Sequence, residues 1–389
     1  MTNSLKKKLK IGIFTDTYSP QINGVVSSIK IFRQELERLG HRVFVYAPKA
    51  SQYKKITAQE KDVIRFESFR LYFQPEYNLS VPLSVDFLKN FFRIKLDIIH
   101  AHTPFSLGLL AFYYAVLKRK PLVHTYHTLY PDYASTYIFR NRISPQRLVA
   151  KISAIFCNRC DLNIAPSPKV KRLLIKYGVK TPIEVLPTGI DIGQFKKMPS
   201  DFRHHYKIKP QAKVLLFVGR LGREKNIEFL LKTLSLLVQN NTNYVLVIVG
   251  GGPNEKKLKA LAQSLKITDH IIFTGYLPSE WVIKAYNAAD LFVFSSLTET
   301  QGMVILEASA CGLPIVAVRD DAFVNILVDG QNGYFTEDNI KQFAETVMKT
   351  LANKKNYRKM RVAAVKIARQ FSIERQTQKL LLLYKALMK

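Results

Sequence analysis

Two glutamates in the second half of the chain, Glu299 and Glu307, lie on either side of a glycine-containing turn. The sequence between them, TQGMVIL, predicts a turn followed by an apolar helix. The first N–H groups of a helix have no partner within it and lie at the positive end of its dipole, so they favour an anion. Carboxylates beside such a helix end can accept hydrogen bonds from sugar and ribose hydroxyls. The candidate binding residues of this segment are Glu299, Gln301, Gly302, Met303, Val304 and Glu307.

Two cations upstream, Arg220 and Lys225, follow an apolar run within the sequence GRLGREK of residues 219–225. Arginine donates as a planar fork and lysine acts as a point charge, so together they suit a diphosphate. The next apolar run ends in a glycine-rich turn at residues 250–252, where Gly251 would let a ligand approach the backbone closely. Hydrated charges and ordinary loop geometry explain the same residues equally well. The residues alone therefore leave both interpretations open.

The first half of the chain places histidines and one aspartate at the ends of predicted strands. The histidines are His100, His102, His124 and His127. A histidine in such a position is more often a structural hydrogen-bonding group than a catalytic one. Asp16 could receive or orient an acceptor hydroxyl, or could cap a helix. The sequence contains no D-x-D pattern, so we expect positive side chains and a helix end, rather than a metal ion, to hold a diphosphate.

Short apolar runs alternate with helical stretches along the whole chain, as in parallel sheets that are buried on both faces. The first series lies at residues 10–15, 42–47, 97–101, 122–125 and 162–165, and the second at residues 214–219, 244–249, 271–274, 291–295 and 315–318. With 389 residues, the chain is also longer than one hydrophobic core usually organises. The pattern predicts two doubly wound α/β domains joined by a linker near residues 186–212. Ligands of such sheets bind beyond the carboxyl ends of the strands, so we expect the chemistry in the cleft between the domains.

The expected boundaries follow from this alternation. We expect a first domain at residues 1–190 and a second at residues 191–365. The tail from residue 353 to residue 389 is amphipathic and contains no glycine or proline, which predicts a helix. Its last part, residues 366–389, could cross back and pack on the first domain.

The chain has a net charge of +30, from 59 Lys and Arg against 29 Asp and Glu. Residues 1–200 carry 32 of the basic and 13 of the acidic side chains, so the excess is concentrated in the first half. Such a surface indicates an anionic partner: nucleic acid, an anionic bilayer or a phosphorylated substrate. We find no RNA-binding aromatic signature, zinc finger or helix-turn-helix pattern, so nucleic acid is not the expected partner.

Two segments of the first half combine cations with apolar residues, as a helix in a membrane interface does. Apolar positions recur at helical spacing within residues 83–96, and residues 137–180 contain ten Arg or Lys against the single acid Asp161. Each cation close to an anionic leaflet contributes about 1 kcal/mol. A helix of the domain core would give a similar apolar stripe. The candidate membrane-binding residues are Phe87, Lys89, Phe91, Phe92, Arg93, Arg140 and Arg142.

The apolar runs, the first residues and the cysteines of the sequence favour a cytoplasmic protein. No run of about 18 apolar residues occurs, and the first residues do not resemble a signal peptide. The three cysteines are too few for a disulfide scaffold, and the pair Cys157 and Cys160 lacks the second pair of a zinc site, which favours helix packing. We therefore expect a cytoplasmic protein that is peripheral on the inner face of the cell membrane.

Taken together, these motifs resemble the family-four retaining glycosyltransferases of the GT-B fold, in which two Rossmann-like domains face each other across a cleft. The resemblance covers nearly the whole chain. It rests on residues 12–25 (GIFTDTYSPQINGV), 124–128 (HTYHT), 165–167 (APS), 187–191 (PTGID), 219–225 (GRLGREK) and 299–307. It implies a hexosyltransferase that retains the anomeric configuration and uses a nucleotide sugar as co-substrate, without a metal ion or other cofactor.

The resemblance also implies roles for single residues of the second domain. Arg220 and Lys225 would hold the donor diphosphate. Glu307 would bind the ribose, and Glu299 the transferred sugar. The backbone of residues 301–304 would contact the sugar and the phosphate.

In the first domain, Gly24 would let a loop approach the phosphates, and His127 would face the sugar ring near the reacting carbon. Residues 300–302 read TQG where many members have Phe-Gly, and residues 105–108 (FSLG) and 124–133 (HTYHTLYPDY) look like those of the diacylglycerol glucosyltransferases. This branch implies transfer of glucose from UDP-glucose to the 3-hydroxyl of 1,2-diacylglycerol. A phosphatidylinositol-type lipid, a lipopolysaccharide or a soluble sugar is the alternative acceptor, and a basic nucleic-acid-binding protein is the alternative from another class.

Overall fold

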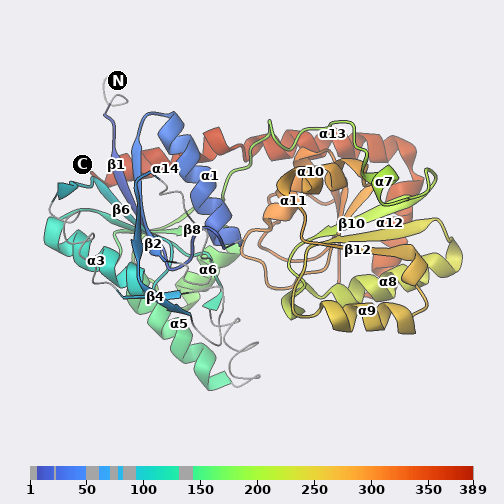
Figure 1. The fold of residues 1–389 in the computed structure, drawn as a ribbon, viewed down its shortest axis with the longest axis horizontal. Helices are drawn as coiled ribbons and strands as arrows, with labels where there is room; N and C mark the ends of the chain where they lie inside the picture. Colours follow the sequence, from blue (N-terminus) through green and yellow to red (C-terminus); the bar gives the residue numbers. More distant parts are fainter. Residues whose placement is uncertain are drawn as a thin grey trace. The chain divides into compact units, whose positions relative to one another are not determined.

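The structure is a computed structural model that describes residues 7–21, 23–49, 61–70, 78–81, 93–130 and 143–388. The chain folds into two compact units. Met1–Gly189 and Ile373–Lys389 form the N-terminal unit, and Ile190–Ser372 forms the C-terminal unit. Each unit is built on its own parallel sheet with helices on both faces (Figure 1). The predicted α/β fold with two doubly wound sheets is confirmed.

The sheet of the N-terminal unit has seven parallel strands in the order β3-β2-β1-β6-β7-β8-β9. Their bounds are β1 (Lys10–Phe14), β2 (Arg42–Pro48), β3 (Val63–Phe66), β6 (Ile98–Ala101), β7 (Leu122–Thr125), β8 (Leu162–Ala165) and β9 (Ile183–Val185). A short antiparallel pair accompanies it, formed by β4 (Ser68–Arg70) and β5 (Asn78–Ser80). The central strands are buried along almost their whole length because helices cover both faces.

Successive side chains of a strand alternate between the two faces, and this alternation divides the core of the N-terminal unit in two. Within the described residues, the helices of this unit include α1 (Gly24–Arg38), α3 (Ser106–Lys118), α5 (Ile143–Cys157), α6 (Pro168–Lys176) and α14 (Ile373–Leu387). Val43 and Val45 of β2 pack in the core of α1 and α14. Phe44 and Tyr46 pack in the core of α3 on the other face, together with Phe156 of α5.

Helix α14 comes from the far end of the sequence and lies against α1 of the N-terminal unit (Figure 1). Leu380, Leu381 and Tyr384 on α14 are buried in the core that α1 forms with the sheet. The expected helix that crosses back to the first domain is therefore present. The chain passes between the units twice, and the two passages lie together because Ile190 N donates to Phe371 O at 2.9 Å.

The sheet of the C-terminal unit has six parallel strands in the order β12-β11-β10-β13-β14-β15. Their bounds are β10 (Lys213–Val218), β11 (Tyr244–Val249), β12 (Ile271–Gly275), β13 (Leu291–Phe294), β14 (Ile315–Val318) and β15 (Gly333–Thr336). The helices are α7 (Phe202–His205), α8 (Ile227–Asn240), α9 (Glu255–Ser264), α10 (Ser279–Ala288), α11 (Met303–Ala310), α12 (Ile340–Ala352) and α13 (Lys354–Gln370), with 3-10 turns η1 (Arg223–Lys225) and η2 (Thr268–His270). Figure 1 shows α8 and α9 on one side of these strands and α10, α11 and α13 on the other.

Two loops of the C-terminal unit approach each other at the carboxyl ends of β10 and β11. Gly250 has a φ of +130°, and a Cβ atom added to it would lie 2.0 Å from the carbonyl oxygen of Gly219. Only glycine fits such a backbone, because both the conformation and the contact exclude a side chain. The glycine-rich turn at residues 250–252 is thus required for packing as well as available for a ligand.

Replacing Gly250 with alanine should lower the free energy of unfolding of the C-terminal unit by about 3 kcal/mol, because the new methyl group collides with a backbone carbonyl. Gly330→Ala is the matched control, since Gly330 also has a positive φ, +73°, but no atom lies within 4 Å of the added Cβ. The control should cost about 1 kcal/mol. Denaturant unfolding followed by the fluorescence of Trp281, the only tryptophan of the chain, measures both. Equal losses would contradict the close approach of the two loops.

Candidate functional site

Two loops that follow neighbouring strands of the C-terminal unit are tied together. Strands β10 and β13 pair in the sheet, so η1 after β10 and the loop after β13 leave the same edge. Ser295 Oγ lies 2.9 Å from the carbonyl oxygens of both Lys225 and Asn226. Ser296 Oγ donates to Glu224 O at 3.2 Å. These two buried hydroxyls fix the turn that carries Lys225.

The side chains of Lys225 and Glu299 form an ion pair between these loops. Lys225 Nζ lies 2.5 Å from Glu299 Oε1, and the two side chains are only 20% and 12% exposed. The backbone N–H of Glu299 donates to Asp320 Oδ2 at 3.2 Å, and Asp320 Oδ1 accepts from Ala322 N at 2.8 Å. A cation and a carboxylate that are this sheltered interact more strongly than a surface pair. The structure thus places side by side two residues that are 74 positions apart in the sequence.

Helix α11 begins directly after this ion pair. Gly302 precedes its first residue with a φ of +77°, a left-handed conformation that suits glycine. The backbone N–H groups of Met303 and Val304 have no hydrogen-bond partner in the described part of the chain. Gln301, just before Gly302, is buried with 5% exposure. An uncapped helix start beside a lysine offers donors and positive potential to an anion.

Glu307 lies one turn further along α11 and has its own partner. Tyr286 Oη of α10 donates to Glu307 Oε2 at 2.7 Å. Burial raises the pKa of the Glu307 carboxyl, and the hydrogen bond from Tyr286 lowers it in part. The tyrosine is itself fully buried, so it holds the carboxylate in one place. Glu307 Oε1 has no hydrogen-bond partner among the described residues, which leaves it available to hydroxyl donors.

Asp16 of the N-terminal unit is buried and caps a helix. Its Oδ1 accepts from Ser106 Oγ at 2.5 Å and from the N–H of Leu107 at 3.1 Å, and its Oδ2 accepts from Thr103 Oγ1 at 2.6 Å. Ser106 and Leu107 are the first two residues of α3, so Asp16 stabilises the N-terminus of that helix. Burial raises the pKa of Asp16 despite these hydrogen bonds. With no exposed surface and both oxygens engaged, Asp16 has the arrangement of a helix cap, the alternative left open by its sequence position.

Four histidines gather at the carboxyl ends of β6 and β7. His102 Nδ1 lies 2.8 Å from His127 Nε2, so one ring donates to the other. The rings of His100 and His102 are 4.2 Å apart, and those of His102 and His127 are 5.1 Å apart and stacked. His100 also contacts Tyr384 of α14, with Nδ1 to Oη at 2.6 Å. The cluster therefore joins two strand ends to the helix that returns from the end of the chain.

Burial keeps these imidazoles neutral. It lowers the pKa of His124 to about 4 and that of His127 to about 3, where the charge of His124 contributes as well. The pKa values of His100 and His102 are also lowered by burial and by the neighbouring histidines. His127 is therefore a neutral ring whose Nε2 is engaged by His102.

The structure also describes three further residues of the predicted site: Gly24, Arg220 and Gly251. Gly24 is the exposed first residue of α1, and no atom lies within 4 Å of an added Cβ. Arg220 is half-buried in the loop after β10. Gly251 faces the ring of Tyr276, at 2.6 Å from an added Cβ.

Of the predicted membrane-binding residues, only Arg93 lies in the described part of the chain, where it is exposed. The others, which lie outside the described residues, are Phe87, Lys89, Phe91, Phe92, Arg140 and Arg142. Cys157 and Cys160 are buried free thiols. Within the described residues, no group of three or more His, Cys, Asp or Glu side chains is arranged to hold a metal ion.

Two partner residues in the C-terminal unit were not found from the sequence: Tyr286 holds Glu307, and Asp320 holds the backbone of Glu299. In the N-terminal unit, His102 was noted but not assigned as the partner of His127. Tyr286 sits in the middle of an ordinary helix, so no local pattern distinguishes it. The only signal for His102 was its position after a strand that neighbours the strand of His127.

The histidine cluster predicts a loss of stability in acid. The unfolded chain protonates His124 and His127 below about pH 6.5, whereas the folded state keeps them neutral, so their contribution is complete above pH 6.5 and declines as the pH falls. Between pH 6.5 and 5.0 each should cost about 2 kcal/mol. His124→Phe should reduce the difference between the unfolding temperatures at pH 7.5 and 5.0. Phe156→Leu, which changes the ring next to His124 without removing a titrating group, should leave that difference intact. The same pH dependence in the wild type and His124→Phe would contradict the buried neutral state.

Two family models match most of the chain. Residues 22–194 match the model described as Glycosyltransferase Family 4, and residues 200–369 match the model described as Glycosyl transferases group 1. HepE from Anabaena, solved in complex with UDP and glucose, has a TM-score of 0.78 at 22% identity, and the alignment covers 97% of this chain and 100% of that one. This likeness shows a common GT-B fold.

Sequence relatives carry the family assignment further. An alpha-monoglucosyldiacylglycerol synthase from Streptococcus pneumoniae is 35% identical over 356 residues, which are 85% of this chain and 76% of the relative. A protein of the same name from Acholeplasma laidlawii is 32% identical over 346 residues, 85% of each chain. Similarity over 85% of the chain, together with the two family models and the two parallel sheets, shows that the chain belongs to glycosyltransferase family 4, the retaining glycosyltransferases of the GT-B fold.

Proposed function

We propose that the chain transfers glucose from UDP-glucose to the 3-hydroxyl of 1,2-diacylglycerol at the inner face of the cell membrane. The observation that carries the donor part is the uncapped start of α11 between Glu299 and Glu307, with Lys225 beside it. The acceptor part is supported by the two relatives that are named as monoglucosyldiacylglycerol synthases. HepE, a structural neighbour, was solved with UDP-glucose, which supports the choice of donor.

The contacts of the C-terminal unit suit each part of such a donor. The N–H groups of Met303 and Val304 and the ammonium group of Lys225 would stabilise the diphosphate as it leaves. Glu307, held by Tyr286, would accept hydrogen bonds from the ribose hydroxyls. Glu299 would accept from the sugar, and its pairing with Lys225 keeps the carboxylate beside the phosphate-binding end of the helix.

Retention of configuration sets the course of the reaction. In the proposed step the acceptor oxygen attacks the anomeric carbon from the face that the diphosphate leaves. The bond from the anomeric carbon to the phosphate oxygen breaks as the new glycosidic bond forms, and the proton of the acceptor hydroxyl passes to the departing phosphate. Cations and helix N–H groups that stabilise the developing negative charge supply the catalysis. His127 would border the sugar as a neutral ring.

Lys225→Ala and Glu299→Ala should each lower glucose transfer by about a hundredfold. Each variant removes a charged contact to the donor and leaves the other member of the ion pair partly buried without its opposite charge. Lys257→Ala is the matched control, since Lys257 forms an exposed ion pair with Glu228 in the same unit. Product formation from radiolabelled UDP-glucose and diacylglycerol vesicles measures the effect, with unfolding temperature as a test of folding.

A panel of other nucleotide sugars and acceptors in the same assay tests the substrate part of the proposal. Activity that requires a different donor or acceptor would overturn the assigned substrates but not the family. Full activity in both folded variants would overturn the assigned donor site.

Membrane binding is supported by exposed apolar residues on two adjacent helices of the N-terminal unit. Leu148, Ile152 and Ile155 form a stripe on α5 at helical spacing, and all three are exposed. Arg147 and Lys151 lie beside the stripe and are exposed too. An apolar stripe with flanking cations is typical of a helix that lies in an anionic membrane interface.

Helix α3 continues this surface. Its exposed apolar residues are Leu109, Tyr113, Val116 and Leu117. The two helices pack together through Phe156 of α5, and Arg159 lies 5.6 Å from the ring centre of Phe112 on α3. None of the helices in the described part of the chain has the length and hydrophobicity for a membrane crossing.

Ile152→Asp should weaken binding to vesicles that contain phosphatidylglycerol by about tenfold or more, because it places a charge in the apolar stripe. Leu382→Asp is the control: Leu382 on α14 belongs to the same unit and is 63% exposed, against 56% for Ile152. Vesicle flotation at low and high salt measures both, and salt should weaken wild-type binding. Indifference of the wild type to lipid charge, or equal losses in the two variants, would contradict a membrane surface on α5.

A further inference from the structure

A polar pocket lies in the C-terminal unit, at the edge of the sheet opposite to the start of α11. It has a volume of about 480 Å³. Its lining residues include Asp290, which immediately precedes β13, whereas Glu299 and the start of α11 follow that strand. The two sites therefore lie at the amino and carboxyl ends of the same strand. The charged residues of the pocket are three cations and one carboxylate: Lys197, Arg203, Arg361 and Asp290.

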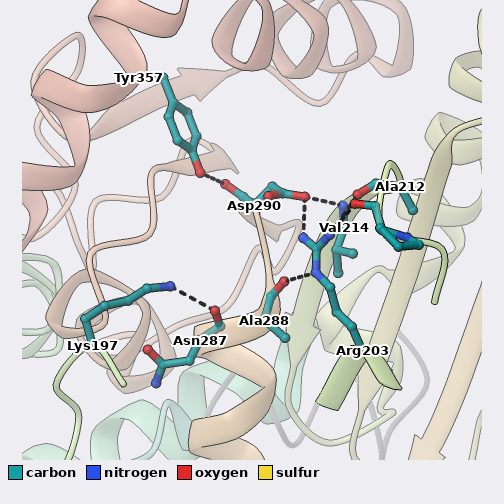
Figure 2. Close-up of polar contacts among 9 residues, drawn as sticks. Lys197, Arg203, Ala212, Val214, Asn287, Ala288, Asp290 and Tyr357 are labelled. Carbon is teal, nitrogen blue, oxygen red and sulfur yellow. Dashed lines mark hydrogen bonds and ion pairs between the residues drawn. The ribbon is translucent and has the colours of Figure 1, made fainter. Parts of the chain in front are cut away.

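The carboxylate of this pocket is already neutralised by one of the cations. Arg203 donates from one amino group to Asp290 Oδ2 at 2.8 Å, and from Nε to Ala288 O at 2.8 Å (Figure 2). The N–H of Val214 donates to the same carboxylate oxygen at 2.7 Å, and Tyr357 Oη donates to the carbonyl of Asp290 at 2.7 Å. Asp290 and Arg203 thus serve to hold the strand end and the loops around it.

The other two cations have donors to spare. Lys197 Nζ donates one proton to Asn287 O at 2.9 Å, which leaves two (Figure 2). Arg361 on α13 donates from Nε to Gly312 O at 3.2 Å, and its two terminal amino groups have no partner in the described part of the chain. Neither residue forms an ion pair with a described carboxylate. Two positive groups with several free donors line one cavity and lack a counter-ion.

The direction of the pKa shift of Lys197 agrees with the absence of a counter-ion among the described residues. Burial lowers the pKa of Lys197, and the nearby charge of Arg361 lowers it further. Asp290 offsets part of this effect only, because its charge is shared with Arg203. A bound anion would remove the repulsion, and phosphate has the geometry that an arginine fork and a lysine recognise.

We propose that the pocket between Lys197 and Arg361 is a binding site for a phosphate group, separate from the donor site. The cavity is larger than a phosphate ion, so it suits a small molecule or a headgroup that carries one. Lys197 would bind one oxygen as a point charge, and the terminal amino groups of Arg361 would bind two others as a fork. The inference does not depend on the donor or acceptor proposed above.

Two methionines allow the two sites to be observed separately. The chain has six methionines; Met198 lines the pocket, and Met303 is the first residue of α11. In the full chain with 13C-labelled methionine methyl groups, titration with inorganic phosphate should shift the Met198 signal. Phosphate that binds at the donor site as well should shift the Met303 signal independently, with its own affinity.

Lys197→Gln and Arg361→Gln should each weaken the response of Met198 by about tenfold or more and leave the response of Met303 unchanged. Lys366→Gln, which removes an exposed cation from the same helix α13, should change neither. Lys225→Ala should affect only Met303. These variants therefore separate a failure at this pocket from a failure at the donor site.

A second arm of the experiment identifies the source of the phosphate group. Vesicles of phosphatidylglycerol and of neutral phosphatidylcholine replace inorganic phosphate in the titration. A response of Met198 to free phosphate supports a soluble ligand, and a response to phosphatidylglycerol vesicles that Arg361→Gln removes supports a lipid headgroup. Absence of both responses, or responses that survive in Lys197→Gln and Arg361→Gln, would overturn the proposal.

Discussion

Parallel strands that are covered on both faces carry mostly apolar side chains, so polar residues gather mainly where the strands end, and this constraint favours chemistry at the ends of the sheet. In the C-terminal unit, β10 and β13 are buried almost throughout, and the polar residues begin directly after them. Ser295 follows β13 directly, and Lys225 and Glu299 lie in the loops after the two strands, whose pairing brings these residues together. The hydrogen bonds from Ser295 and the ion pair between Lys225 and Glu299 then hold the loop after β10 against the loop after β13. Helix α11 begins beside these two loops without a side-chain cap. Its first N–H groups therefore stay available to a ligand.

The same constraint explains which strands could be predicted from sequence. The central strands were predicted to within about one residue at each end because burial on both faces gives an uninterrupted apolar run. Three outer strands were missed: β3, β9 and β15. Each lies at an edge or carries partly exposed positions, such as Arg65 in β3 and Glu184 in β9. An edge strand is held in the sheet largely by backbone hydrogen bonds to one neighbouring strand. Its side chains are partly exposed, so its sequence lacks the continuous apolar pattern that identifies a central strand.

Some residues of the candidate sites could also be predicted from the sequence, whereas others could not. The segment from Glu299 to Glu307 could be found from sequence because its turn, helix start and carboxylates are consecutive. The partners of these residues could not, since contact between Tyr286 and Glu307 depends on how α10 packs against α11. Asp16 is the clearest case. Its position after a strand fitted both a site residue and a helix cap, and only the fold, which brings Leu107 to it from 91 positions away, shows the cap.

Helix α10 contributes a residue to each of the two sites in the C-terminal unit, although nothing in its sequence suggests a part in any site. Tyr286 donates to Glu307 of α11, and the next residue, Asn287, accepts from Lys197 at the pocket. Asn287 also anchors the chain that enters the unit, since its side-chain oxygen accepts from the N–H of Met198 at 2.9 Å. A ligand that drew Lys197 away from Asn287 would release a hydrogen bond at the end of the helix that orients Glu307. The two sites therefore share helix α10 as well as strand β13, and the packing of α10 offers a path for energetic coupling between them.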